Sequence, residues 1–281
     1  MRKNSRIKKD RKKIGFTLIE LLAVIVVLLI IALIATPLVL KYINNAKLRS
    51  FETSINGVKN AIDYYVMNKE LNDEELYNHE VVNVKDLNLK NKDNLSGTVT
   101  IYKNGDNYTI SYNNITDGTY IAKGDNENNE ITDIRTANKP ILLATDDKIV
   151  IDSYKYYIYG IDNPFKLETL FKVVNGDIEF VKSNPNFYGT GTKIIVKKDG
   201  NIVDTYTVVI FGDINGDSAI DAFDASLYNL ALSGNHPLSE YQFLAADINR
   251  NGKLEQEEYQ IFYDLVVGKC EINQQSGKVN C

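Results

Sequence analysis

The longest apolar stretch of the chain lies near its N-terminus. Residues 21–40 are 20 consecutive positions without a charged side chain. A helix rises 1.5 Å per residue, so this stretch spans about 30 Å, the thickness of the hydrocarbon core of a bilayer. The pattern therefore predicts one membrane-spanning helix. Pro37 lies inside it and is expected to kink the helix, because proline removes one backbone hydrogen bond.

An amphipathic pattern follows the apolar stretch. Apolar residues recur at intervals of three and four positions, which places them on one face of a helix. Gly57 lies within this segment and costs about 1 kcal/mol relative to alanine. We expect the apolar face to pack on a sheet, with a coiled-coil stalk as the alternative. The residues of this face are Leu48, Phe51, Ile55, Val58, Ile62 and Tyr65.

Beyond the helix, a polar segment and then β-prone runs predict a small β-rich head at 71–139. Residues 71–94 are rich in Asn, Asp, Glu and Lys, which indicates a linker or an irregular segment. Asn104-Gly105 separates two β-prone runs and predicts a hairpin, because both turn positions can adopt positive φ. The expected strands are 98–102, 108–112 and 119–122, followed by a loop at 124–130.

Residues 140–210 predict a second small unit, a β-rich spacer with one helix. The helix is expected at 165–174, because Asn163-Pro164 precedes it and proline favours the first turn. The run at 189–192 reads Gly-Thr-Gly-Thr, but it lacks the Lys-Ser/Thr ending and the following helix of a phosphate loop. Phosphate binding is therefore not expected there. The expected strands are 149–159, 178–181, 193–197 and 204–211.

Two twelve-residue segments, 213–224 and 247–258, repeat at an offset of 34 residues. Each places oxygen-bearing side chains at positions 1, 3, 5, 9 and 12 and a backbone carbonyl at position 7, the spacing with which a loop wraps one Ca²⁺ ion. We expect two calcium sites; the alternative is a pair of Asx-rich turns without an ion. The expected ligands are Asp213, Asn215, Asp217, the carbonyl of Ala219, Asp221 and Asp224, and then Asp247, Asn249, Asn251, the carbonyl of Lys253, Glu255 and Glu258.

The two loops differ at position 6, which needs positive φ for a sharp turn. Gly252 meets this requirement in the second loop, whereas Ser218 in the first loop meets it at a cost of roughly 1–2 kcal/mol. Ile220 and Leu254, at position 8, are expected to join the loops through a short β contact. A helix is expected after each loop, at 222–232 and at 256–267.

Charge and composition narrow the function. Eight of the 32 Lys and Arg residues lie in residues 1–15, with only one of the 37 Asp and Glu residues. This basic flank predicts a cytoplasmic N-terminus and an extracellular body. The acidic remainder does not suit nucleic acid, whose phosphates attract basic side chains. With two His and two Cys residues, and no evident carboxylate pair, we expect neither a zinc site nor catalysis, and no small-molecule substrate.

Residues 15–20 read Gly-Phe-Thr-Leu-Ile-Glu, which resembles the type IV prepilin processing motif. The resemblance implies that a prepilin peptidase cuts between Gly15 and Phe16 and that the new N-terminal Phe16 is methylated. A secretory signal peptide is the alternative, but its apolar stretch is shorter and precedes the cleavage site. In pilins the glutamate that matches Glu20 pairs with the N-terminal amine of a neighbouring subunit during filament assembly. The alternative for Glu20 is a carboxylate in the headgroup zone of a plain anchor.

The run Gly-Asp-Ile-Asn-Gly-Asp at 212–217, with the duplicated loops and helices, resembles a type I dockerin. Residues 189–211 also resemble β modules that precede dockerins. Dockerins bind cohesin modules through residues at the start of each helix, so we expect the apolar first pair, with Phe223, to bind and a symmetric dual mode to be absent. A purely structural calcium module is the alternative, since Glu258 is typical of an ordinary EF-hand loop. The matching positions are Ala222, Phe223, Gln256 and Glu257.

The two cysteines, Cys270 and Cys281, are expected to form a disulfide outside the membrane, with free thiols as the alternative. So short a loop would contribute up to roughly 3 kcal/mol. The whole chain is then an α+β, multidomain protein. Its parts are a leader at 1–15, a transmembrane and amphipathic helix at 16–70, the head at 71–139, the spacer at 140–210, a dockerin-like domain with EF-hand-type loops at 211–268, and a disulfide-closed tail at 269–281.

These features predict a type IV pilin-like (pseudopilin) protein of the cell membrane that displays a calcium-dependent docking module. The expected partners are the membrane, prepilin peptidase, other pilin subunits and a cohesin-type module. Its size favours a minor subunit, and the choice between a pilus and a type II secretion pseudopilus stays open. One alternative is a membrane-anchored, calcium-stabilised surface protein that does not enter a filament. A cellulosomal component for polysaccharide breakdown is the other.

Overall fold

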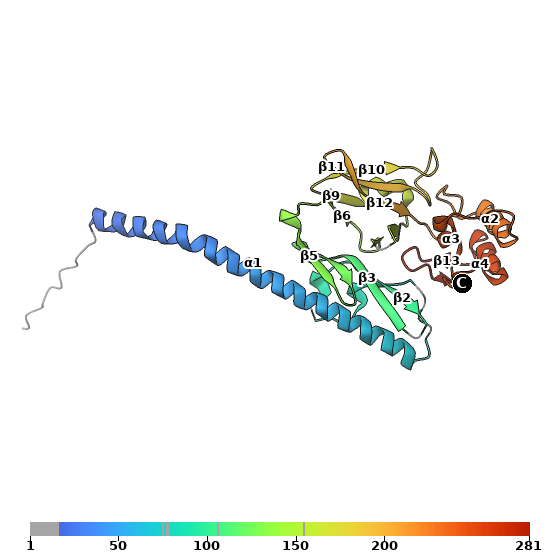
Figure 1. Cartoon of the computed structure of the whole chain (residues 1–281), viewed down its shortest axis with the longest axis horizontal. Helices are drawn as coiled ribbons and strands as arrows, with labels where there is room; N and C mark the ends of the chain where they lie inside the picture. Colours follow the sequence, from blue (N-terminus) through green and yellow to red (C-terminus); the bar gives the residue numbers. More distant parts are fainter. Residues whose placement is uncertain (1–16, 75, 77–78, 91, 106, 154) are drawn as a thin grey trace, which may run out of the picture. The chain divides into compact units, whose positions relative to one another are not determined.

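The structure is a computed structural model that describes residues 17–74, 76, 79–90, 92–105, 107–153 and 155–281 (Figure 1). It divides into two compact units, 1–50 and 51–281. Gly15 and Phe16, the expected processing site, lie outside the described residues.

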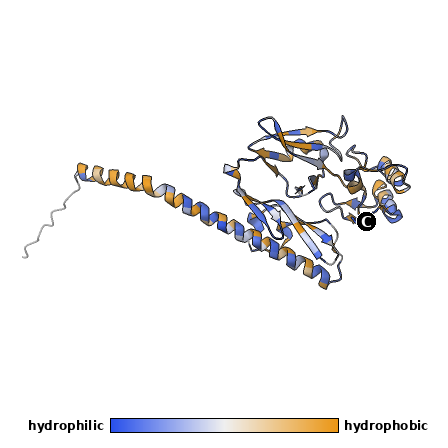
Figure 2. Cartoon of the chain, in the orientation of Figure 1, coloured by the Kyte–Doolittle hydropathy of each residue, from blue (hydrophilic) through white to orange (hydrophobic). Residues whose placement is uncertain are grey.

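The first unit contains the N-terminal part of helix α1, which extends from Leu18 to Leu71. Between Leu18 and Ile43 its large apolar side chains are exposed, and Figure 2 shows a run of hydrophobic turns there. Among the described residues, α1 is the one helix long and apolar enough to cross a membrane. The predicted long apolar N-terminal helix is therefore confirmed, and Pro37 lies within it without ending it.

In the second unit, the remainder of α1 lies along a five-stranded antiparallel sheet (Figure 1). The ring of Phe51 stacks on Tyr120 with 5.8 Å between centroids, and Ile55, Val58 and Ile62 are fully buried. The expected packing of the apolar face on a sheet is thus confirmed. In order, the strands are β1 (Glu80–Asn83), β2 (Thr98–Asn104), β3 (Asn107–Thr116), β4 (Tyr120–Asp125) and β5 (Asn129–Asp133), with the 3₁₀ turns η1 (Val84–Asp86), η2 (Lys92–Asn94) and η3 (Ile134–Thr136).

Two predictions for the head are wrong. The expected irregular segment 71–94 contains strand β1, and the expected loop 124–130 contains the end of β4 and the start of β5. In β1 two valines, Val81 and Val82, lie between polar residues and pair with β2. In the second place the polar ends of β4 and β5 pair, because backbone hydrogen bonds to a neighbouring strand do not depend on apolar side chains. The hairpin at Asn104-Gly105 is present as β2 and β3, with Asn104 opposite Asn107.

A buried ion pair joins α1 to β1. The Nζ atom of Lys69 lies 2.7 Å from Oε1 of Glu80, and the two residues are 7% and 3% exposed. The hydroxyl of Tyr65 also donates to Glu80, and Nζ of Lys278 lies 3.6 Å from the same carboxylate. Burial raises the pKa of Glu80, but the hydrogen bonds from Lys69 and Tyr65 outweigh it, so the net direction is downward. Because breaking such a pair costs about 3–5 kcal/mol, it fixes how the helix sits on the sheet.

The spacer contains a second five-stranded sheet, in the order β10, β11, β12, β8, β7, in which β12 and β8 run parallel. Its core is built from aliphatic side chains such as Ile151, Ile158 and Ile194. A separate pair, β6 (Ile141–Ala144) and β9 (Phe171–Val174), lies beside it. The strands of the larger sheet are β7 (Val150–Asp152), β8 (Tyr157–Tyr159), β10 (Asp177–Val181), β11 (Lys193–Lys198) and β12 (Asn201–Val208).

Two predictions for the spacer are also wrong. The helix expected at 165–174 is a short 3₁₀ helix, η4 (Pro164–Thr169), followed by strand β9. Proline does begin the helical turn, but the β-branched Val173 and Val174 then pair with β6. The single strand expected at 149–159 is two strands, because the chain turns between β7 and β8, where Tyr156 adopts φ 58°.

Three helices form the C-terminal part of the second unit: α2 (Ala222–Leu232), α3 (Glu240–Ala246) and α4 (Gln256–Val266). They enclose a core of Ile214, Tyr228, Ala246, Ile248 and Phe262. Helix α3 was not expected from the sequence. It begins at Ser239, whose hydroxyl and N–H both donate to the side-chain oxygen of Gln242, as in a capping box.

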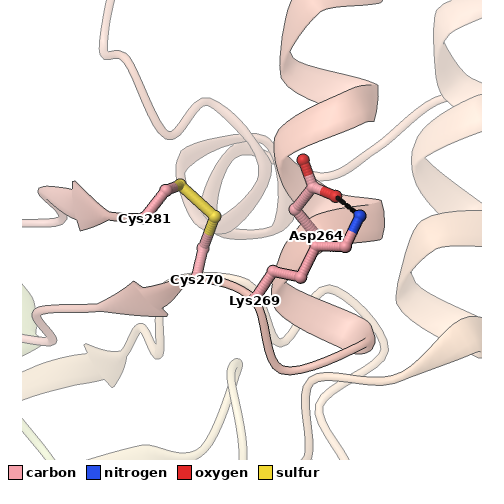
Figure 3. Close-up of a disulfide and its surroundings, with 4 residues drawn as sticks. All are labelled: Asp264, Lys269, Cys270 and Cys281. Atoms are coloured by element: carbon pink, nitrogen blue, oxygen red, sulfur yellow. Dashed lines mark hydrogen bonds and ion pairs between the residues drawn. A yellow bond between two sulfur atoms is a disulfide. The ribbon is translucent and has the colours of Figure 1, made fainter.

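The chain ends in a small hairpin of β13 (Glu271–Ile272) and β14 (Val279–Asn280). A disulfide joins Cys270 to Cys281 across the base of this hairpin (Figure 3). Beside it, Lys269 forms an ion pair with Asp264 of α4 at 3.3 Å. The side chains of Ile272 and Val279 pack against the helical core, so the tail is part of the same compact unit.

Candidate metal centre

Each of the two predicted loops is organised by the carboxylate at its first position. In the first loop, Oδ1 of Asp213 accepts hydrogen bonds from the N–H groups of Gly216 at 2.8 Å and Asp217 at 3.1 Å. Its Oδ2 accepts one from Ser218 at 3.2 Å. These bonds turn the backbone around the carboxylate and determine the curvature of the loop.

The second loop repeats this arrangement. Oδ1 of Asp247 accepts the N–H of Asn251 at 3.1 Å, and its Oδ2 accepts the N–H of Gly252 at 2.9 Å. The residues that donate are again at positions 5 and 6. Two sequences that differ at most positions therefore form the same turn, because both have an aspartate at position 1.

The acid at position 12 joins the end of each loop to its beginning. Oδ1 of Asp224 accepts the N–H groups of Ile214 at 2.8 Å and Asn215 at 3.0 Å, and its Oδ2 accepts that of Asp221 at 2.9 Å. In the second loop, Glu258 accepts the N–H of Asn249 at 3.1 Å through its longer side chain. Each loop is thereby closed on itself in the first turn of the following helix, where Asp224 and Glu258 are the third residues of α2 and α4.

Two pairs of the remaining expected ligands are hydrogen-bonded to each other. The side-chain amide of Asn215 donates to Oδ2 of Asp217 at 2.8 Å in the first loop. In the second, the amide of Asn251 donates to Oε2 of Glu255 at 2.7 Å. The loops thus gather oxygen-bearing side chains from positions 3, 5 and 9. The carboxylate of Asp221 also caps α2 by accepting the N–H of Phe223 at 2.7 Å.

Both loops need positive φ at positions 4 and 6. In the first loop these are Gly216 with φ 75° and Ser218 with φ 75°. In the second they are Arg250 with φ 57° and Gly252 with φ 80°. The strain expected at Ser218 is therefore present, and the second loop carries an equivalent strain at Arg250, which the sequence analysis missed. Each of the two non-glycine residues, Ser218 and Arg250, costs roughly 1–2 kcal/mol at positive φ.

Charge is the strongest constraint on the loops. Asp213, Asp224 and Glu258 are fully buried, and Asp247 is 4% exposed. Within the part of the chain that the structure describes, none of the four forms an ion pair with a basic side chain. Burial raises the pKa of each of Asp213, Asp224 and Asp247 to about 6. Backbone N–H groups lower the pKa in each case, but they do not outweigh the burial.

This donor set fits a hard divalent cation. Carboxylate, amide and carbonyl oxygens are the ligands that Ca²⁺ prefers, and a cation would supply the positive charge that the buried carboxylates lack. In the described residues no three Asp, Glu, His or Cys side chains cluster closely enough to enclose a metal. The acidic side chains do not cluster because the carboxylates at positions 1 and 12 accept loop N–H groups. The other expected donors include Asn side chains and backbone carbonyls, which are not acidic groups.

Two contacts in this region could not be found from the sequence. The hydroxyl of Tyr228 on α2 donates to Glu258 at 2.8 Å and accepts the N–H of Glu255 at 2.9 Å, so the first half of the region supports the second loop. The guanidinium of Arg250 lies 4.4 Å from the ring centroid of Phe211. No sequence pattern around Tyr228 or Arg250 predicts these partners.

The expected β contact between the loops is wrong. Neither Ile220 nor Leu254 lies in a strand or bridge. The side chain of Ile220 instead lies against Gly212, where a Cβ atom would come within 2.9 Å of it. Leu254 packs on the helical core that includes Tyr228 and Phe262. Side-chain packing therefore holds these two positions in place of backbone pairing.

The expected partner-binding residues are all on the surface. Phe223 is 70% exposed, and Ala222, Gln256 and Glu257 are exposed as well. Along α2, Leu227 is half-buried and Leu230 is 44% exposed, so with Phe223 they form an apolar strip at positions i, i+4 and i+7. We call these three residues the α2 strip.

Glu20, the expected assembly residue, lies at the start of α1. Its Oε2 atom accepts the N–H of Thr17 at 2.8 Å and the Thr17 hydroxyl at 2.9 Å. The N–H of Glu20 donates to that hydroxyl at 3.3 Å. Thr17 and Glu20 thus form a capping box at the N-terminus of the helix.

The raised pKa values predict how calcium and pH act together. In metal-free buffer the pKa of Asp213, Asp224 and Asp247 is about 6 in the folded chain, above the value of about 4 in the unfolded chain. The protonated carboxyl groups therefore stabilise the fold below about pH 4, and this contribution is lost as the pH rises through about 6. A bound cation reverses this preference. We expect excess Ca²⁺ to raise the melting temperature by about 5 °C or more at pH 7.5 and by much less at pH 5.

Circular dichroism of the full chain in detergent, with and without Ca²⁺ at each pH, checks this. Comparing the two conditions at one pH cancels the effects of all other titrating groups. An equal rise in melting temperature at pH 5 and pH 7.5 would contradict the expected role of the buried carboxylates.

The family comparisons agree with this geometry. Residues 10–36 match the model of the prokaryotic N-terminal methylation motif, and residues 211–261 match the model of the dockerin type I domain. The second match contains both loops and most of α4. Neither the curated proteins nor the solved structures give a match to the chain. The two matches confirm the resemblance predicted from the sequence: the chain combines a pilin-like N-terminal methylation motif with a type I dockerin domain.

Proposed function

We propose that this chain is a pilin-like membrane protein that presents a calcium-dependent dockerin module to a cohesin-type partner. One observation carries the proposal: within the matched dockerin region, Phe223 is 70% exposed in the first turn of α2. A large aromatic side chain exposed at the start of a helix is a typical anchor for a protein interface. The neighbouring apolar residues of the α2 strip extend that surface along the helix.

Calcium is proposed to act on the shape of this surface. The first loop would hold one ion through Asp213, Asn215, Asp217, the carbonyl of Ala219, Asp221 and Asp224, and the second loop would hold another through the matching positions. Bound Ca²⁺ supplies the positive charge that offsets the buried carboxylates. Asp221 both belongs to the ligand set and caps α2 through the N–H of Phe223, so the loop positions the residue that is proposed to touch the partner.

The proposed interface uses the α2 face and not both faces. The equivalent first turn of α4 presents Gln256 and Glu257, which are polar and charged. Since charged residues are depleted at the centres of protein interfaces and aromatic residues are enriched, the α2 face is the better candidate. Catalysis forms no part of the proposal.

The N-terminal part is proposed to anchor the chain. Prepilin peptidase would cut between Gly15 and Phe16, the basic flank would stay in the cytoplasm, and α1 would cross the membrane. The disulfide between Cys270 and Cys281 suits an extracellular body, where thiols are oxidised.

Binding to purified type I cohesin modules tests the docking proposal, using the full chain in detergent micelles. We expect at least one module to bind in Ca²⁺ and to be released by a chelator. Phe223→Asp should weaken that binding at least about tenfold, because it places a charge at the anchor of the interface. Phe165→Asp is the matched control, since Phe165 is 75% exposed on the spacer, and it should bind as the unchanged chain does.

Equal loss of binding in both variants would contradict the assignment to the α2 face. Failure of every module to bind, with the chain folded and calcium-loaded, would favour a structural calcium module.

A second candidate function, a membrane anchor that does not enter a filament, is favoured by the capping box of Thr17 and Glu20. A plain anchor needs that cap to begin its helix, but it does not need the charge. Glu20→Gln keeps the capping side chain and removes the charge, whereas Glu20→Ala removes both. If the chain assembles through the carboxylate, both variants should remain in the membrane and fail to enter filaments.

Immunodetection in sheared surface fractions and in membranes measures the two outcomes. Filament entry by Glu20→Gln, with loss only in Glu20→Ala, would contradict the pairing of Glu20 with a neighbouring amine.

A further inference from the structure

The Gly-Thr-Gly-Thr segment at 189–192 of the spacer lies against the first loop, and no role has been assigned to it. The N–H of Thr190 donates a hydrogen bond to Oδ2 of Asp213 at 2.9 Å. Thr190 is 2% exposed and Asp213 is fully buried, so water does not compete for this bond. A residue of the spacer therefore contacts the first expected ligand of the first calcium loop directly.

The contact continues along the loop backbone. The hydroxyl of Ser183 donates to the carbonyl of Gly216 at 3.1 Å. A Cβ atom at Gly189 would lie 2.2 Å from that same carbonyl oxygen and 2.6 Å from Oδ2 of Asp213. Only a glycine leaves room for the two backbones to approach so closely, which explains the first glycine of the segment.

The segment is itself held in place by the strand that leads into the first loop. The hydroxyl of Thr190 accepts the N–H of Ile210 at 3.0 Å and donates to the carbonyl of Ile210 at 3.1 Å. The N–H of Gly191 donates to the carbonyl of Val208 at 2.9 Å. The donor to Asp213 is thus fixed in position before any ion binds.

Among the described residues, no spacer residue donates a hydrogen bond to the carboxylate of Asp247, the first position of the second loop. The carboxylate of Asp247 accepts the N–H groups of Asn251 and Gly252, which belong to its own loop. Each loop has one non-glycine residue at positive φ, Ser218 in the first loop and Arg250 in the second, so the contact with Thr190 distinguishes the first loop and the strain does not. An additional fixed donor to Asp213 would offset part of the strain that Ser218 introduces.

We propose that the spacer segment 189–192 is a positioning element of the first calcium site, and that calcium at this site in turn holds the spacer against the docking module. The inference rests on the proposed calcium binding. Linkage makes the effect reciprocal: a segment that improves calcium affinity is stabilised by calcium to the same extent. Thr190 and Gly189 act through Asp213 and do not contact the ion.

Calcium titration calorimetry of the full chain in detergent tests this proposal with Gly189→Ala. The added Cβ cannot fit against Gly216, so the first-loop binding step should weaken at least about tenfold while the second-loop step stays unchanged. Asp217→Ala, which removes a ligand of the first loop only, identifies which step is which. Gly176→Ala is the matched control: its Cβ would also meet a backbone carbonyl, that of Lys197 at 2.5 Å, but within the spacer and not at the loop.

A milder variant covers the case in which Gly189→Ala does not fold. Ser183→Ala adds no atom and deletes the hydrogen bond to Gly216, so the first step should weaken about two- to tenfold, the range for one hydrogen bond. Hydrogen exchange gives a separate measurement: Ca²⁺ should slow exchange of the Thr190 amide in the unchanged chain but not in Asp217→Ala.

The outcomes separate this inference from the proposed function. Two normal binding steps in both Gly189→Ala and Ser183→Ala, with Thr190 exchange indifferent to Ca²⁺, would overturn the positioning role and leave calcium binding intact. Equal weakening by Gly189→Ala and Gly176→Ala would also overturn it, because the effect would then be general destabilisation. An unchanged chain that binds no calcium would overturn both.

Discussion

Four buried carboxylates that form no ion pair with a basic side chain of the described residues are the constraint on which the C-terminal part of this chain depends. Asp213, Asp224, Asp247 and Glu258 lie at the first and last positions of two twelve-residue loops and are almost completely buried. Backbone N–H groups satisfy their hydrogen bonds, but they supply no net positive charge. Burying an uncompensated charge is costly, so the arrangement favours a bound divalent cation in each loop. The helices that carry the proposed docking surface, α2 and α4, begin within the last three positions of these loops.

The loops also connect the docking module to the rest of the body. Arg250, at position 4 of the second loop, donates to the carbonyl of His79 in the head and lies over the ring of Phe211, the first residue of the dockerin-like region. Gln274 of the tail accepts the N–H of Phe211 at 2.7 Å and donates to its carbonyl at 2.9 Å. These contacts come from the head and the tail, and Thr190 of the spacer contacts the first loop. The dockerin region is therefore integrated into one compact unit instead of hanging from a linker.

This integration gives the proposed function a physical basis. A docking module on a membrane-anchored protein keeps a fixed orientation relative to the body only if it is attached rigidly. Both loops take part in that attachment, the first through Thr190 and the second through Arg250. Ions that complete the loops would therefore stiffen both the docking surface and its connection to the spacer.

Sequence patterns predicted the parts of this structure that local chemistry determines. The apolar helix, the stripe from Phe51 to Ile62, the hairpin at Asn104-Gly105 and the helices after the loops all follow from periodicity, turn residues or capping. Strand β1 was missed because its two valines lie within a stretch rich in polar residues, and the burial of Glu80 depends on its ion pair with Lys69, eleven positions earlier in the chain. Helix 165–174 was predicted wrongly because pairing with β6, a tertiary contact, overrides the helical start at Pro164.

The same limit applies to the candidate site. The spacing of the acids predicted two equivalent loops, and both form the same turn around the aspartate at position 1. The ligand roles of the other positions stay predictions. The contacts of Thr190, Tyr228 and Arg250 join residues far apart in sequence, and a single sequence carries no signal for such pairs. For this reason the loops could be found by reading the chain, whereas their attachment to the spacer and head required the structure.

Counting the calcium ions bound by the full chain tests the central claim most directly. Equilibrium dialysis against ⁴⁵Ca²⁺ at neutral pH, with the chain in detergent micelles, gives the number without any assumption about function. The account predicts two ions per chain, one for each pair of buried carboxylates. Binding of no calcium by a correctly folded chain would contradict it, because the four carboxylates would then be stable in the interior without a counter-charge.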